Sequence, residues 1–205
     1  MYNTHESGSV RKAGFNMKSI YTKPLLLGAS LVAFTAWAEP APAAEWTVAP
    51  ESSTVTFSST QQGSKFSGKF EEFTATINFD PANPAAGKIV GVVKTESANT
   101  RDSSRDTSLM ERDWFYVDKY PEARFESKTI EKTADGFRAN GDLTIKGETL
   151  PIALNFTFTG KDAGTAQFVG KMKVNRFDYN VGEGWNDPSY VGQDVDVEIK
   201  LDLKK

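Results

Sequence analysis

The chain of 205 residues contains no cysteine, and its single histidine is His5. The absence of cysteine excludes disulfides, thiol nucleophiles and the acylated cysteine of bacterial lipoproteins. Because His5 precedes the export signal described below, a histidine-based catalytic site is excluded in the processed chain as well. The usual zinc, copper and haem sites also depend on imidazole or thiolate. The sequence therefore predicts no catalytic residues, no metal site and no cofactor.

Long apolar runs are scarce too. The one that stands out, Leu25–Phe34, follows the basic Met17-Lys18 and precedes Ala36-Trp37-Ala38, which is an A-x-A cleavage pattern. This order is typical of a secretory signal peptide, and the run is shorter than the roughly 20 residues that a transmembrane helix needs. We predict an upstream extension or mis-start (1–16), a signal peptide (17–38), a linker (39–45) and one folded domain (46–205). The processed protein is expected to be soluble and periplasmic, without an integral membrane segment.

Positive charge is also limited. Four of the 24 basic residues and one of the 27 acidic residues precede residue 39, which leaves the processed chain with a net charge of about −6. Nucleic acids and anionic membrane surfaces require a basic patch on the protein that binds them. The composition therefore argues against both as partners.

Alternation of apolar and polar residues dominates the rest of the chain. It runs through Ile152–Phe158, Ala166–Val174 and Val195–Leu203, and a period of two gives each strand one apolar face. Together with turn signals such as Asp135-Gly136 and Lys146-Gly147, it predicts antiparallel hairpins. The eight expected strands are Thr54–Ser59, Lys69–Phe79, Lys88–Glu96, Arg124–Lys132, Gly136–Ile145, Glu148–Thr159, Thr165–Asn175 and Gln193–Leu203. The predicted fold is all-β, an eight-stranded antiparallel β-barrel.

Two segments interrupt this pattern, Ser97–Ala123 and Phe177–Tyr190. In the first, which follows the third expected strand, Ser103 and Asp106 have the spacing of a capping box and predict a short helix. Leu109 and Met110 are expected to face the protein from that helix. Long loops on small barrels commonly cover one end, where binding residues gather.

Four stretches of the chain resemble the YceI-like lipid-binding family in their order and spacing. They are Trp46-Thr47-Val48 before Ser53–Phe57; Phe66–Phe70 before Ile77–Asp80; Arg105–Leu109, Asp113–Phe115 and Tyr120–Phe125; and Gly141–Gly147 before Leu150-Pro151-Ile152. The resemblance covers essentially the whole processed chain. It implies an exported, lipocalin-like barrel that holds a long apolar lipid, such as a polyprenyl phosphate or the tail of a quinone. It also implies a binding protein, not an enzyme, and it allows a homodimer.

The inward apolar residues would then line a cavity. They are Phe57, Phe70, Phe73, Ile77, Phe79, Val90, Phe125, Leu143, Ile145, Ile152, Leu154, Phe156, Phe158, Phe168, Met172, Val195 and Val197. An eight-stranded barrel can be filled by its own side chains or can hold one small ligand, and periodicity alone leaves both readings open. The alternative function is therefore a stress-response or protein-interaction module with a filled barrel and no lipid.

Further candidates lie in the two irregular segments. Leu109, Trp114, Phe115, Tyr179, Trp185 and Tyr190 are expected to form the mouth or lid of the cavity. Arg101 and Arg105, near the predicted helix start, would contact an anionic head group, since arginine and helix N-termini both favour phosphate. A solvated helix turn with an internal Arg–Asp pair is the simpler interpretation of the two arginines.

Overall fold

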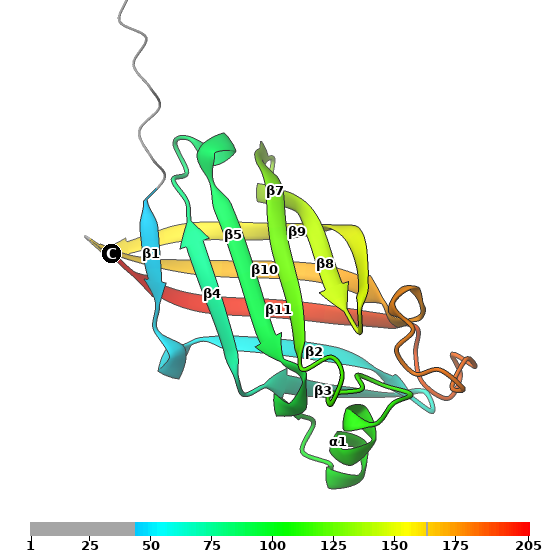
Figure 1. Cartoon of the computed structure of the whole chain (residues 1–205). Coiled ribbons are helices and arrows are strands. Elements are labelled where there is room, and N and C mark those ends of the chain that lie inside the picture. The colour runs from blue at the N-terminus through cyan, green and yellow to red at the C-terminus, as the bar shows by residue number, and fades with distance from the viewer. Residues whose placement is uncertain (1–43, 163) are drawn as a thin grey trace, which may run out of the picture. The chain divides into compact units, whose positions relative to one another are not determined.

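The computed structural model describes residues 44–162 and 164–205, which form a β-barrel with one α-helix beside it (Figure 1). The predicted upstream extension, signal peptide and all but the last two residues of the linker lie outside these ranges. Within them, no helix is both long enough and apolar enough to cross a membrane.

The helix is α1 (Ser103–Met110), and short 3₁₀ turns are η1 (Pro50–Ser52), η2 (Pro84–Ala86), η3 (Thr95–Ser97) and η4 (Arg176–Tyr179). The strands are β1 (Glu45–Val48), β2 (Thr54–Gln61), β3 (Ser64–Phe70), β4 (Phe73–Asn78), β5 (Lys88–Lys94), β6 (Ala98–Asn99), β7 (Glu122–Thr133), β8 (Gly136–Ile145), β9 (Glu148–Asp162), β10 (Thr165–Asn175) and β11 (Asp194–Lys204).

Eight of these strands close into a ring in the order β1-β4-β5-β7-β8-β9-β10-β11. Closure depends on β1, which pairs with β4 on one side and with the last residues of β11 on the other. The strands β2, β3 and β6 continue the sheet from the other half of β11. The predicted all-β, eight-stranded antiparallel barrel with a short helix is confirmed.

The strand predicted over Lys69–Phe79 is wrong, because the chain turns a corner within it. β3 ends at Phe70 and β4 begins at Phe73, so the two phenylalanines are three residues apart and break the period of two. The backbone of Glu71 at this corner donates to the carbonyl of Ser97, outside any strand. The four residues of β1 were also too few to be recognised by alternation.

The helix begins one residue earlier than the predicted capping box implies. Its N-cap is Asp102, whose carboxylate accepts two backbone N–H groups of the first turn at 3.1 Å, so Ser103 is the first helical residue. Asp106 does not complete a capping box. Its Oδ1 instead accepts the backbone N–H and the hydroxyl of Thr100, at 2.8 and 2.6 Å. These bonds tie the helix to the segment that leads into it.

The barrel interior differs between its two halves. On β11, Leu201 and Leu203 are each 1% exposed, whereas Val195, Val197 and Ile199 on the same face are only half-buried. Around the two leucines, aromatic rings pack with centroids 4.8 to 5.4 Å apart. These rings, which define what we call the filled half, belong to Trp46, Phe79, Phe137, Phe156, Phe158 and Phe168.

We predict that protonation of Glu126 weakens the barrel wall in acid. Lys88 (2.5 Å) and Arg124 (2.8 Å) donate to its carboxylate and lower its pKa from 4.5 to about 2. Its contribution to stability is therefore complete above about pH 4.5 and is lost as the pH falls toward 2, because the unfolded chain takes up this proton more readily. In urea titrations, Glu126→Gln should lose less stability than the wild type between pH 5 and pH 3. An equal loss in both would contradict this assignment.

Candidate functional site

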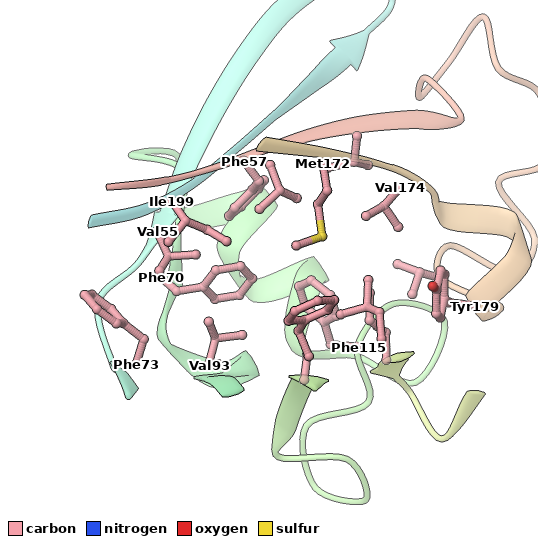
Figure 2. Close-up of a pocket in the computed structure, with 18 of the residues that line it drawn as sticks. Val55, Phe57, Phe70, Phe73, Val93, Phe115, Met172, Val174, Tyr179 and Ile199 are labelled. Carbon is pink, nitrogen blue, oxygen red and sulfur yellow. The ribbon is translucent and has the colours of Figure 1, made fainter. Parts of the chain in front are cut away.

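The half of the barrel opposite the aromatic rings contains a cavity of about 180 Å³ (Figure 2). About 10–15 Å³ of such empty space is enough to hold one buried water molecule, so this cavity is far larger than a packing defect. β2 and β3, the inner faces of β4, β5, β7, β8, β10 and β11, and the two irregular segments line it. The barrel is therefore filled at one end and hollow at the other.

The lining is almost entirely apolar. Its polar side chains are Ser59, Thr74 and Arg176, together with the polar atoms of the Trp114 and Tyr179 rings. Ser59 already donates its hydroxyl to the carbonyl of Asp194 at 2.8 Å. The described lining contains no carboxylate, imidazole or thiol, and the described residues contain no group of acidic, histidine or cysteine side chains able to hold a metal ion. Such a surface favours a hydrocarbon guest.

Two small residues create part of the hollow. Ala75 of β4 lies directly opposite Gly91 of β5, and both face the cavity. A Cβ atom built on Gly91 would meet no atom within 4 Å. The next pair toward the filled half is Ile77 and Ile89, which are 1% and 3% exposed. The change from isoleucine to alanine and glycine therefore marks where packing stops.

Nine of the predicted lining residues line this cavity, namely Phe57, Phe70, Phe73, Phe125, Leu143, Ile145, Met172, Val195 and Val197. Seven others do not line it and instead belong to or pack against the main buried cluster, namely Ile77, Phe79, Ile152, Leu154, Phe156, Phe158 and Phe168. Val90 lies on the outer face, paired with Thr76 and Glu126, because Ile89 takes the inward position. Sequence reasoning missed inward residues on β2, β5 and β11, among them Val55, Val93 and Ile199.

The two irregular segments meet over one end of the cavity and form a lid, which we define as residues 109–116 and 177–191. Of the predicted mouth residues, Leu109, Trp114, Phe115 and Tyr179 line the cavity. Trp185 and Tyr190 are 47% and 52% exposed and do not, although the Trp185 ring lies 6.4 Å from that of Trp114. Met110, expected to face the protein, is 39% exposed.

Hydrogen bonds hold the two parts of the lid together. The backbone N–H groups of Gly182 and Glu183 donate to the carbonyl of Asp113 at 2.7 and 3.0 Å. The buried ammonium group of Lys146, in the β8–β9 turn, donates to the carbonyls of Asp113 and Asn180 at 3.3 and 2.6 Å. Lys146 therefore links the two lid segments to each other and to the β8–β9 turn.

Arg176 organises the second part of the lid, and sequence reasoning missed it because no local pattern distinguishes it from other arginines. It is only 3% exposed and lines the cavity. Its side chain donates five hydrogen bonds of 2.5 to 3.3 Å, all to backbone carbonyls between residues 181 and 192. Burial lowers its pKa, yet an arginine stays charged. Gly182 is required beside it, since a Cβ there would lie 2.3 Å from Nη1.

The predicted head-group arginines lie outside the cavity. Arg105 extends over the Phe66 ring at 4.4 Å, and its Nε donates to Gln61 at 3.1 Å. Its guanidinium is also 3.7 Å from Asp102, an Arg–Asp pair within the helix turn, whereas Asp106 bonds to Thr100 instead. Arg101 is exposed and does not line the cavity.

Fold and site together define a class: an antiparallel barrel with one filled end and one hollow, apolar, lidded end. Comparison with known proteins identifies the family, because the profile of the YceI-like domain matches residues 46–203. The chain belongs to the YceI-like family, as its sequence motifs predicted.

Individual relatives agree with this assignment. Protein YceI of Escherichia coli is 32% identical over 140 residues, which is 66% of this chain and 72% of the relative. A UPF0312 protein of Photorhabdus laumondii is 35% identical over 125 residues, which is 57% of this chain and 65%, just under two thirds, of the relative.

Solved structures share the fold. BcnA of Burkholderia cenocepacia has a TM-score of 0.72 and 30% identity, covering 76% of this chain and 99% of that one. A polyisoprenoid binding domain from Saccharophagus degradans has a TM-score of 0.59 over 78% of this chain and 97% of its own. At 16% identity, the second likeness shows the fold alone.

We predict that Arg176→Lys destabilises the lid and the protein. Lysine keeps the charge but has three donors instead of five, so at least two of the five carbonyls lose their hydrogen bond to residue 176. Each such loss costs about 1–3 kcal/mol, and we expect a total of at least about 2 kcal/mol in urea unfolding. Arg138→Lys, at an exposed arginine of β8, is the matched control and should be nearly neutral. Equal changes in the free energy of unfolding for the two variants would contradict the stabilising role of Arg176.

Proposed function

We propose that the protein is an exported, periplasmic carrier or storage protein that binds a long-chain apolar lipid in its barrel and catalyses no reaction. The observation that carries this proposal is the cavity of about 180 Å³ with its almost wholly apolar lining. It argues against the alternative of a filled barrel. An engineered cavity of about 150 Å³ in another protein binds benzene, so this one has room for at least a five-carbon isoprene unit.

The lipid class we propose is a polyisoprenoid, such as a polyprenyl phosphate or a quinone tail. Membership of the YceI-like family supports this choice, and a solved structure of the same fold is described as a polyisoprenoid binding domain. The export signal predicted over residues 17–38 supports the periplasmic location. The absence of an acid, a base or a thiol in the described cavity lining supports a binding role instead of catalysis.

The apolar tail should set the affinity. Each buried CH₂ group contributes roughly 0.8 kcal/mol, so one isoprene unit contributes at most about 4 kcal/mol. Micromolar binding needs about 8 kcal/mol net, after association costs of roughly 4–15 kcal/mol. Few polar groups reach the cavity, and the five N–H groups of Arg176 already have acceptors. The head group therefore stays outside, and selectivity among head groups should be weak.

We predict that lipid stays with the protein during purification without detergent. Native mass spectrometry should then show protein with added masses that dissociate as apolar lipid, and extraction should identify isoprenoid chains. A homodimer, which the family resemblance supports, would give the same adducts at twice the protein mass. A bare protein that also takes up no added geranylgeraniol would contradict the proposed function.

We predict that Gly91→Leu fills the cavity and weakens binding. The new side chain occupies space that no atom fills, without a positive φ at this position, so the fold should remain stable or gain stability. Affinity for cis-parinaric acid, a fatty acid with an apolar polyene chain, should fall by about tenfold to a hundredfold as sites for three or more carbons are lost. Energy transfer from tryptophan to the polyene measures it.

Gly160→Leu is the matched control for this substitution. Gly160 is exposed on β9 and is also free of neighbours within 4 Å of an added Cβ, but it lies away from the cavity. The Gly160→Leu variant should bind the polyene with the same affinity as the wild type. Unchanged binding by Gly91→Leu would place the ligand elsewhere.

A further inference from the structure

The barrel wall lacks a strand ladder along one side of β4. On one side, β4 pairs with β5 along its whole length, from Phe73 to Asn78. On the other side it pairs with β1 only at Ile77 and Asn78. The chain then leaves β1 through η1, and β2 pairs with β11 and β3 but not with β4. Within the described residues, positions 73–76 of β4 therefore have a ladder on one side only.

This break in the wall, which we call the side gap, opens onto the cavity. Its borders carry Val55 of β2, Phe70 of β3, and Phe73 and Ala75 of β4, and all four line the cavity. Figure 2 shows Val55, Phe70, Phe73 and Ile199 gathered on one side of the cavity, away from Tyr179 of the lid. Phe70, Phe73 and Ala75 are only half-buried. Apolar side chains, instead of backbone hydrogen bonds, therefore close the wall here.

The lid end is closed in a different way. Five hydrogen bonds from Arg176 fix the loop to the barrel, and Lys146 and the Asp113 carbonyl join the two lid segments. Opening the lid would break several of these bonds and leave a buried charge without its acceptors. Widening the side gap requires only that a few phenylalanine and valine side chains change rotamer.

We propose that the side gap is the port through which a hydrocarbon chain enters and leaves the cavity, while the lid stays shut. This inference rests on the proposed function, since it concerns the route of the same apolar ligand. The gap exposes apolar side chains to the incoming chain and continues into the apolar lining, so the chain need not pass a polar barrier. Part of a chain longer than the cavity can also extend out through it.

The chain has no cysteine, so single cysteines can be introduced and modified cleanly. Thr54→Cys and Thr76→Cys place a thiol on each border of the side gap, at exposed positions that do not line the cavity. Asn186→Cys places one on the exposed side of the lid, and Thr157→Cys places one on the outer face of β9, remote from both. Each purified variant is converted to its mixed disulfide with glutathione, a bulky and charged adduct, and is later released with reductant.

The readout is stopped-flow binding and release of cis-parinaric acid. Glutathione at Thr54→Cys or Thr76→Cys should slow association and dissociation together, by roughly tenfold or more. The reason is that a blocked route changes both rates without changing the free energies of the bound and free protein. The dissociation constant should stay within about twofold, and reductant should restore both rates. Adducts at Asn186→Cys and Thr157→Cys should change neither rate.

Slowing by the lid adduct but not by the gap adducts would overturn the proposal and place the port at the lid. Equal rates for all four adducts would overturn it too. If the unmodified protein bound no polyene, the proposed function would fail. This outcome is distinguishable from a wrong route, because no variant would then give a binding signal.

Discussion

The structure depends on how the aromatic side chains are distributed inside one barrel. Six rings contributed by β1, β8, β9, β10 and the segment after β4 fill one half at contact distance. All six belong to or pack against one buried cluster, and burial of such rings stabilises the closed sheet. Because this half is filled, the other half can remain hollow without loss of the fold, and smaller residues such as Ala75 and Gly91 face it. Stability and binding space are thus separated along the barrel axis.

The lid follows from a second constraint, the burial of two cations. Arg176 and Lys146 have little access to water, so their charges must be balanced by hydrogen-bond acceptors. Backbone carbonyls of the lid supply nearly all of them, and Glu183 adds a carboxylate 3.4 Å from Lys146. The same bonds that satisfy the cations therefore fix the loop over the cavity. Because these bonds use all of their N–H groups, the two residues shape the site without offering a free N–H to a ligand.

Alternation predicted the barrel, its antiparallel hairpins and the inward faces of most strands, because a period of two is a local property. It could not separate cavity from core, since Phe156 and Val197 obey the same rule although one packs against rings and the other faces empty space. That difference depends on which side chains meet across the barrel. Alternation could not predict the corner at Glu71–Glu72 or the role of Arg176 either, because both depend on hydrogen-bond partners that are distant in the sequence.

Ligand binding in this protein depends on the half of the barrel beside Gly91 being a dry, apolar cavity. The most direct test is diffraction from ligand-free crystals under pressurised xenon, which enters apolar cavities and scatters strongly. We expect xenon between Gly91, Phe57 and Met172, and none among the rings around Phe79. A cavity region without xenon, filled instead by side chains or by ordered water, would contradict it.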